Sequence, residues 1–236
     1  MISGIEDTPE PAKPLLAARG MPIAARSVVP AFEVDMLVWP GDLQIVHTRD
    51  KDSSRDIADG LLGLGTAGGD VSYLGRAWRE LQPAAALNLR RDVGRVQSGG
   101  NWMETRSVME NLMLPVLHHT ILPERQLRQA ASELARRFGL PGLPTSLPGE
   151  CTTADLERAA CVRAFLGHPT LVILEHPMEF EDASLLAPMM NAIQQVRWRQ
   201  GAVIWFTEHL AHLRDASIPA DRRFLLAGTR LLEVES

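Results

Sequence analysis

A carboxylate and an imidazole stand next to each other in the sequence, at Glu175 and His176. A carboxylate can bind a metal ion or a water molecule, and a histidine can act as a base near neutral pH. The pair directly follows the apolar run Leu171–Leu174, which is typical of a parallel strand buried on both faces. We therefore expect both side chains at the end of a buried strand. General-base chemistry also needs a substrate that is already bound, so the pair alone defines no reaction.

A second polar cluster follows the apolar residues Leu43–Val46, in a loop that we expect from His47 to Arg55 ahead of a helix over Asp56–Leu64. The loop mixes hydroxyls, cations and acids, namely Thr48, Arg49, Asp50, Lys51, Asp52, Ser53, Ser54 and Arg55. A loop at this place can hold phosphate when glycines let backbone N–H groups close around it. Side chains hinder the positive φ that such turns require. A polar surface loop without a task is the open alternative.

The composition limits the classes of function. The chain has 236 residues, of which 45% are apolar and 22% charged, as is ordinary for a globular protein with one core. A net charge of −5 argues against a nucleic-acid partner. Cys151 and Cys161 form no CxxC pair, which disfavours a metal or redox centre. We see no signal peptide and no apolar run long enough to cross a bilayer, so we expect a cytoplasmic protein without direct membrane insertion.

Strands and helices alternate along the chain. Residues 1–26 contain four prolines and predict a flexible leader or an irregular first strand. Phe32–Val46 is apolar apart from the turn Trp39–Asp42 and predicts a hairpin. Further helices are expected over Gln126–Phe138, from a cap at Thr152 or Thr153 towards Leu166, and over Ala183–Gln200. A buried strand is expected over Val203–Phe206 and a hairpin over Phe224–Val234. This order predicts an α/β layer fold with right-handed crossovers.

Three stretches resemble the ABC ATPase family in the correct order. They are "GDLQIVHTRDKDSSRDIADGLLGL", "RDVGRVQSGGNWMETRSVMENLMLPV" and "ECTTADLERAACVRAFLGHPTLVILEHP". The wording "QSG…VMEN…LP" is most similar to the Mla/Mce lipid-transporter ATPases. The likeness implies a P-loop NTPase-like three-layer α/β core with a mainly parallel sheet, an antiparallel β element and a helical subdomain. It divides the chain into a leader (1–26) and one domain (27–236), with a core lobe (27–100 and 151–236) and a helical subdomain (about 101–150).

The resemblance places the family's phosphate loop, G-x-x-x-x-G-K-[ST], on Thr48–Arg55. Thr48 and Ser53 then replace the glycines, Ser54 the lysine, and Arg55 the hydroxyl that holds Mg²⁺. Lys51 is an alternative source of the missing lysine charge. Three acids, Asp50, Asp52 and Asp56, surround the place of a triphosphate and repel it. The resemblance therefore implies that ATP and Mg²⁺ are bound weakly or not at all.

The other nucleotide-binding motifs of the family are matched in position, but several of their residues are substituted. Glu175 takes the place of the Walker B aspartate and is the one candidate metal ligand, and His176 takes that of the catalytic glutamate. Glu208 stands at the switch histidine, with His209 one residue later. Gln97 matches the Q-loop glutamine, and Asp182 matches the D-loop aspartate that contacts a partner subunit.

The signature motif of the family matches Thr152, Thr153 and Ala154, where a serine and two glycines approach the phosphate held by the opposing subunit. The matched helix start keeps one hydroxyl, and Asp155 adds a negative charge to its first turn. A threonine followed three positions on by an acid is also an ordinary helix cap. Capping is the simpler interpretation of these residues.

The family also implies a docking groove beside the Q-loop, where a membrane subunit inserts a short coupling helix. Trp102 and Met103 are the candidate contacts, because tryptophan and methionine suit a hydrophobic docking groove. Val108, Met109 and Met113 follow at helical spacing and are better explained as core.

The leading hypothesis is a catalytically impaired ABC subunit that docks on a membrane permease of a lipid-type transporter, at the inner face of the cell membrane. It would pair with itself or with an intact ATPase subunit. The first alternative is a working ATPase that uses Lys51 or Arg55 for phosphate, Glu175 for metal, and His176 or His209 as base. The second is a stand-alone interaction module.

Overall fold

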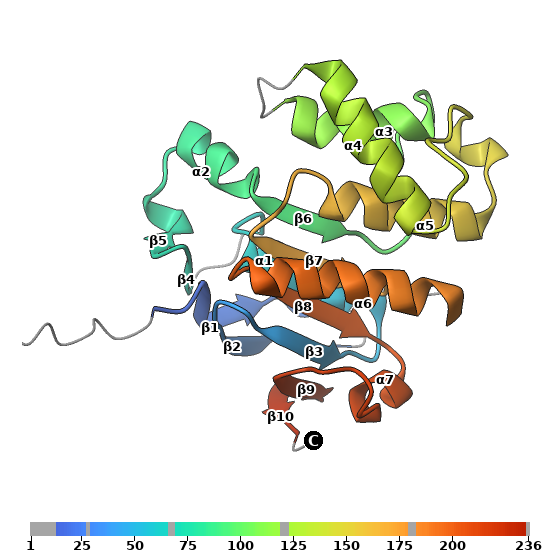
Figure 1. Cartoon of the computed structure of the whole chain (residues 1–236). Coiled ribbons are helices and arrows are strands. Elements are labelled where there is room, and N and C mark those ends of the chain that lie inside the picture. The colour runs from blue at the N-terminus through green and yellow to red at the C-terminus, as the bar shows by residue number, and fades with distance from the viewer. Residues whose placement is uncertain (1–12, 27–28, 66–68, 119–122, 179–182, 235–236) are drawn as a thin grey trace, which may run out of the picture.

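A six-stranded sheet forms the centre of the computed structural model, which describes residues 13–26, 29–65, 69–118, 123–178 and 183–234 (Figure 1). Its strands, in spatial order, are β10 (Arg230–Glu233), β9 (Arg222–Ala227), β3 (Leu43–His47), β8 (Ala202–Thr207), β7 (Leu171–Glu175) and β6 (Val93–Val96). Neighbouring strands are parallel except β9 and β10. Every residue of β3, β7 and β8 is buried, which confirms the strands predicted from their continuous apolar runs.

A second, antiparallel sheet has the order β2-β1-β4-β5. Its strands are β1 (Leu16–Ile23), β2 (Phe32–Val38), β4 (Asp70–Tyr73) and β5 (Arg76–Ala77). The predicted flexible leader over residues 1–26 is therefore wrong for its second half, because β1 pairs with strands on both sides. A register shift between Ala18 and Met21 makes β1 the irregular first strand that was the alternative.

The predicted hairpin over Phe32–Val46 is also wrong. β2 pairs with β1, whereas β3 pairs with β8 and β9 in the other sheet. Between them, the Asp42 side chain accepts a hydrogen bond from the Trp39 N–H at 2.8 Å and closes the turn. The chain crosses between sheets because β3 is buried on both faces and needs a covered position that an edge hairpin does not offer.

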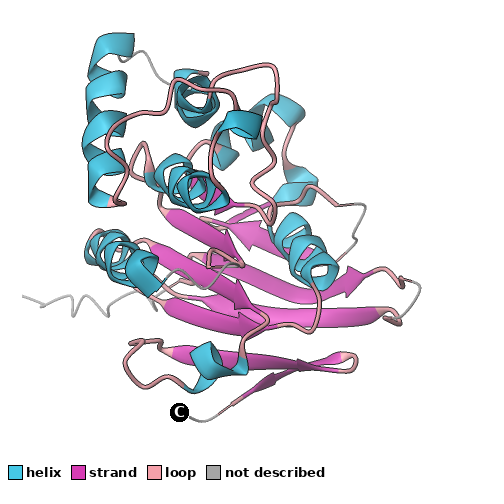
Figure 2. Ribbon diagram, turned by 90° about the vertical axis from the view of Figure 1, so that its right-hand side faces the viewer, coloured by secondary structure: helices cyan, strands magenta, loops and turns pink. Residues whose placement is uncertain are grey.

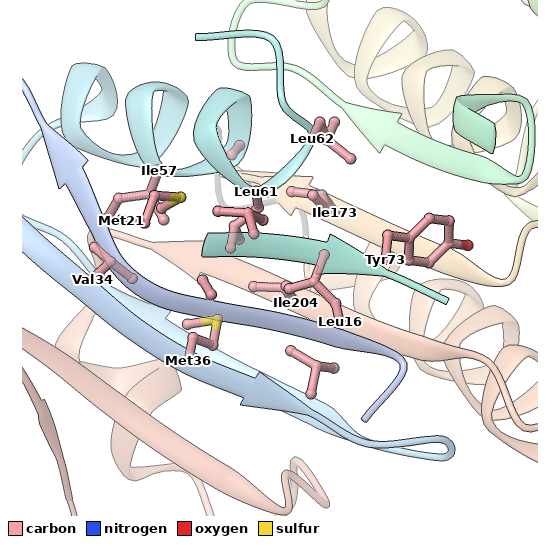
Figure 3. Close-up of a cluster of buried hydrophobic side chains, with 14 of the residues drawn as sticks. Leu16, Met21, Val34, Met36, Ile57, Leu61, Leu62, Tyr73, Ile173 and Ile204 are labelled. Carbon is pink, nitrogen blue, oxygen red and sulfur yellow. The ribbon is translucent and has the colours of Figure 1, made fainter. Parts of the chain in front are cut away.

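Alternate residues of the central strands enter two different cores. Ile173 and Ile204 face the antiparallel sheet and the helix over Lys51–Leu61, together with Leu16, Met21 and Met36 (Figure 3). Leu171 belongs to the same core. Val172, Leu174 and Trp205 face the opposite core, which is shared with the helices on the other side. This alternation follows from the two-residue period of a strand and creates the three layers.

Seven α-helices lie in the described part of the chain, and Figure 2 shows most of them gathered on one side of the strands. They are α1 (Lys51–Leu61), α2 (Pro83–Arg90), α3 (Val108–Leu117), α4 (Glu124–Arg137), α5 (Thr153–Phe165), α6 (Ala183–Trp198) and α7 (Leu210–Arg214). Two short 3₁₀ turns cover Trp78–Glu80 and Pro148–Glu150. The predicted helices over Gln126–Phe138 and Thr153–Leu166 and the hairpin over Phe224–Val234 are confirmed as α4, α5 and β9–β10.

α1 begins well before the predicted Asp56, because Asp50 caps it and the polar residues behind it continue the helix. α3 and α4 form the helical region expected between about 101 and 150. Across the described residues, no helix combines the length and the apolar character that a membrane span requires.

Candidate functional site

The first turn of α1 is the start of the candidate site. Asp50 has an extended backbone, and its carboxylate accepts hydrogen bonds from the Ser53 N–H and the Ser53 hydroxyl, both at 2.7 Å. An N-cap of this type satisfies N–H groups that the helix cannot pair itself and places a negative charge at the positive end of the helix dipole. Most of the predicted loop Thr48–Arg55 is therefore helical, and only Thr48 to Asp50 connect β3 to α1.

A buried chain of hydroxyls and one imidazole joins α1 to the strands behind it. The Thr48 and Ser54 hydroxyl oxygens are 2.6 Å apart, and the Ser54 hydroxyl lies 2.8 Å from Nε2 of His176. All three residues are buried, Thr48 and Ser54 completely. Backbone bonds complete the connection, because the Thr48 and His176 N–H groups donate to the carbonyls of Thr207 and Phe206 at the end of β8, at 3.0 Å each. The ends of β3, β7 and β8 are thus held together by this Thr48–Ser54–His176 network.

Glu175 has a different partner. Its side chain is fully buried, and Oε1 accepts a hydrogen bond from Nε of Arg95 on β6 at 2.5 Å. Nη1 of Arg95 donates in turn to Asp59 of α1 at 2.6 Å. Burial raises the pKa of Glu175, and the hydrogen bond and charge of Arg95 oppose that rise. Among the described residues, Oε2 of Glu175 has no hydrogen-bond partner.

Two further candidates near the phosphate loop, Arg55 and Asp56, are paired with other side chains. Arg55 lies 3.3 Å from Asp52 in an exposed ion pair. Asp56 accepts two hydrogen bonds of 2.6 Å from Arg26. Neither of these candidates joins the buried network.

A cavity of about 250 Å³ lies beside the network at the end of β8. It is lined by Lys51, His176, Glu208 and His209, which the sequence singled out, and by His212, which it did not. The closest approach of His176 to Glu208 is 3.9 Å, from Nδ1 to Oε2. His209 therefore shares one cavity with Glu208 and His176. Within the described residues, no set of His, Cys, Asp and Glu side chains has a metal-binding arrangement.

His212 and His47 complete the surroundings of Glu208. Nδ1 of His212 lies 3.0 Å from the Thr207 hydroxyl, and its ring meets that of His209 edge-on at 5.2 Å. Nε2 of His47 lies 3.0 Å from the Glu208 carbonyl, and burial lowers the pKa of His47. The three-residue spacing of His209 and His212 in a short helix was the available sequence signal for His212. For His47, at the end of an apolar strand, and for Arg95, inside one, the sequence holds no comparable signal.

Gln97, the Q-loop candidate, borders a second cavity that His176 also lines. The Gln97 carboxamide accepts a hydrogen bond from Asn101 at 2.9 Å, and a turn follows in which Gly99 and Gly100 have φ of +74° and +78°. A cavity of about 200 Å³ is bordered by Gln97, Thr153 and His176 together, so three of the matched motifs meet there.

The candidate docking residues differ in exposure. Trp102 is half-buried, with its ring 4.6 Å from the Arg163 guanidinium, which also donates to the Gly100 carbonyl. Met103 is 46% exposed and lines a cavity of about 370 Å³ between the Q-loop turn and α3. Val108 and Met113 are buried, which confirms their assignment to the core.

At the start of α5, the expected cap is present. The Thr152 hydroxyl accepts a bond from the Asp155 N–H at 3.1 Å and donates to the Asp155 carboxylate at 2.8 Å. Thr152 and Thr153 are exposed, and Ala154 is partly buried. Asp182, the predicted D-loop contact, lies outside the described residues.

Comparison with known proteins shows which solved structures share this fold. No protein-family model matches the chain. Among solved structures, the dimeric bacterial ABC transporter cassette MJ0796 superposes with a TM-score of 0.78 at 16% identity, over 94% of this chain and 99% of the other. An ATP-binding subunit of an ABC transporter superposes with a TM-score of 0.75 at 20% identity, over 92% and 88% of the two chains. The chain has the fold of an ABC ATPase cassette.

Curated proteins similar to this chain include transporter ATP-binding proteins. The L-cystine transport system ATP-binding protein TcyN of Escherichia coli is 26% identical over 64% of this chain and 60% of that protein. The intermembrane phospholipid transport system ATP-binding protein MlaF of Haemophilus influenzae is 24% identical over 68% and 63%. The methionine import ATP-binding protein MetN 1 of Lactiplantibacillus plantarum is 27% identical over 60% and 39%. The chain thus matches less than two thirds of the length of each relative. A phospholipid transport protein stands among these relatives beside amino-acid transport proteins.

Proposed function

We propose that this chain is a catalytically impaired nucleotide-binding-type subunit of an ABC transporter, which docks on a membrane permease instead of driving it by hydrolysis. The observation that carries the proposal is the Thr48–Ser54–His176 network together with the Asp50 cap. By the resemblance, Thr48 and Ser54 take the places of a phosphate-loop glycine and lysine, and His176 takes that of the catalytic glutamate; here they bond to one another. Asp50, inside the same loop, bonds to the Ser53 N–H. On this proposal the protein works at the inner face of the cell membrane, through its partner, and pairs with itself or with an intact ATPase.

The first support is that the N–H group of Ser53 at the start of α1 is already hydrogen-bonded within the protein. A phosphate cradle needs free backbone N–H groups, and the Ser53 N–H is already bonded to Asp50. A triphosphate would have to displace that carboxylate and then lie close to Asp50 and Asp52. Each such repulsion costs roughly 1 to 4 kcal/mol at intermediate dielectric. The hydroxyl of Ser54, at the lysine position, carries no charge to offset this cost.

The second support concerns magnesium. Mg²⁺ is bound by carboxylate oxygens and water in octahedral geometry. The one candidate ligand, Glu175, has its Oε1 bonded to the Arg95 guanidinium. Arg95 thus places an internal positive charge against the carboxylate that would face the metal. The residues present do not fit a magnesium nucleotide, so weak or absent binding of ATP and Mg²⁺ remains our prediction.

The third support is the surface beside the Q-loop. Met103 is exposed above a cavity of about 370 Å³, and a methionine adapts well to an inserted helix. Trp102 borders the neighbouring cavity. A permease coupling helix in this groove matches the surface chemistry. The lipid-type permease rests on the "QSG…VMEN…LP" wording and on the likeness to the phospholipid transport protein MlaF.

Calorimetric titration with ATP and Mg²⁺ tests the proposal, and we expect no saturable heat with the wild-type chain. A variant combining Thr48→Gly, Ser53→Gly, Ser54→Lys and Arg55→Ser restores the phosphate-loop pattern, and adding Asp50→Ser removes the competing carboxylate. This variant should gain measurable nucleotide affinity. Micromolar affinity and steady turnover of the wild-type chain would contradict the proposal.

A working ATPase with substitute residues is the second candidate, because Lys51, His176 and His209 line the same cavity. On this reading Lys51 holds phosphate and one histidine acts as the base. Substituting His176 by alanine distinguishes the two candidates once turnover is measured. A large loss of turnover would favour the ATPase, and unchanged turnover would remove His176 from any mechanism.

A further inference from the structure

The groove between α4 and α6 is the most prominent surface without an assigned role. Its two hollows, of about 410 and 190 Å³, share Leu134 and Arg137 of α4 and Ala192 and Gln195 of α6. α5 packs against both helices, and its last residues, Phe165 and Leu166, line the smaller hollow. The groove therefore has two helical walls and an apolar base.

Trp198 stands at the end of one wall. It is 73% exposed, the largest exposed fraction among the exposed large apolar side chains of the described residues. It lines the larger hollow together with Phe138 and Pro188. An aromatic side chain left in water beside an apolar hollow is the residue type that most often dominates binding at protein interfaces.

The groove carries two arginine guanidiniums that can pair with an anionic partner. Arg137 and Arg199 line it, and neither guanidinium has an ion-pair or hydrogen-bond partner within the described part of the chain. The acid in the lining, Glu133, accepts a bond from Gln129 at 3.1 Å. By contrast, Arg95, Arg197 and Arg222 all bind carboxylates of the chain itself. On a protein of net charge −5, two unpaired guanidiniums beside an exposed tryptophan call for an anionic partner.

We propose that this groove binds an acidic amphipathic helix of a partner protein. A groove between two helices accepts the ridges of a third, and the apolar face of that helix would cover Trp198 and Leu134. Its carboxylates would pair with Arg137 and Arg199 as charge-assisted, bidentate contacts. The site is lined by other residues than the nucleotide-site candidates, so it stands whether or not this chain binds ATP.

A display library of helical peptides tests the proposal. Each peptide has 18 residues, about 27 Å of helix, with leucines at i, i+3, i+4 and i+7 and with Glu, Gln or Lys at the polar positions. Selection on the full chain should enrich peptides of net negative charge. Their affinity should fall at least tenfold in Trp198→Ala and in the double variant Arg137→Glu, Arg199→Glu, and it should weaken with salt.

Two control variants carry the same changes elsewhere. Leu232→Ala removes another exposed apolar side chain, and Arg76→Glu reverses another exposed charge. Both should bind the selected peptides like the wild type. Enrichment of neutral or basic peptides, no enrichment at all, or unchanged binding by Trp198→Ala would overturn the proposal. A concentration-dependent dimer in sedimentation that Trp198→Ala abolishes would also overturn it, since the occupant would then be a second copy of the chain.

Discussion

The N-termini of α1 and α5 make an instructive pair. By resemblance, both would face phosphate, and in this chain both are capped by the protein's own oxygen atoms. At α1, Asp50 caps the helix by accepting a bond from the Ser53 N–H. The neighbouring residue Ser54 is completely buried and is bonded to Thr48 and His176. At α5, Thr152 and Asp155 form an exposed local cap.

The two helix starts differ in how far their caps are connected to the rest of the fold. The groups around α1 now connect three strands, so their removal should weaken the whole domain. The groups at α5 satisfy only their own helix. Substitutions along the two regions should therefore separate into large and small losses of unfolding free energy.

The largest loss is expected for Arg95→Met. It leaves Glu175 as a buried charge without its partner, and breaking a buried pair in this way costs about 3 to 5 kcal/mol of unfolding free energy. Urea unfolding measures the loss. The matched control is the double variant Arg95→Met, Glu175→Gln, which removes both charges and should recover most of it. A single-variant loss below about 1 kcal/mol would show that the pair is not structural.

The pH dependence of the Arg95→Met deficit follows from Glu175. Burial raises the folded-state pKa of Glu175, and removing Arg95 raises it further, because Arg95 lowers it. A carboxyl whose folded pKa is raised favours the folded state below its unfolded pKa, and this contribution is lost as the pH rises through the folded pKa. The deficit should therefore be larger at about pH 7.5 than at about pH 5. An equal deficit at both values would assign the loss to packing.

The Thr48–Ser54–His176 network should give the next largest effect. Ser54→Ala leaves two buried partners with an unmade hydrogen bond, which costs about 1 to 3 kcal/mol. A double-mutant cycle of Ser54→Ala with His176→Ala should show a coupling energy above about 0.5 kcal/mol. Ser132→Ala, on the outer face of α4, is the matched control and should change stability by less than about 0.5 kcal/mol. Strictly additive losses would contradict the network.

Asp50→Ala should weaken α1 by about 1 kcal/mol, the usual cost of losing an N-cap. Asn at this position keeps an acceptor for the Ser53 N–H, so Asp50→Asn should lose less. Chemical denaturation of both variants measures the difference. If Asp50→Ala and Asp50→Asn lose the same amount, the charge of Asp50 and not its cap geometry would be responsible.

The periodic parts of the fold could be predicted from the sequence, because burial on both faces leaves a continuous apolar run in β7 and β8 and helical spacing in α4. The partition of β2 and β3 into different sheets could not, since strand pairing is set by distant partners such as β8 and not by the turn between them. The same holds for β1. The prolines of residues 1–26 favoured a flexible leader, whereas pairing with β2 and β4 stabilises β1 as a strand.

The motif order predicted which stretches of the chain form the candidate site, but it did not predict the hydrogen bonds among their side chains. The order of the motifs located Ser54, Glu175 and His176. The fold brings them to the C-terminal ends of β3 and β7, where Ser54 bonds to His176 while Glu175 bonds to Arg95. The start of α1 was missed because a loop pattern was assumed where Asp50 caps a helix. Arg95 was missed because a cation inside a short strand acquires its meaning only from Glu175 and Asp59, which lie far away in the sequence.

The smallest effect is expected at α5. Thr152→Ala removes an exposed cap and should cost about 0.5 to 1 kcal/mol, while Thr152→Ser keeps the acceptor and should cost less. Because Thr152 and Ser54 lie in separate networks, the loss in Thr152→Ala should add to that of Ser54→Ala within about 0.5 kcal/mol. Denaturation of both single variants and the double variant measures this sum. A clear departure from additivity would mean that the two helix starts are coupled across the cavity bordered by Thr153 and His176, and that the contrast between a structural α1 cap and a local α5 cap does not hold.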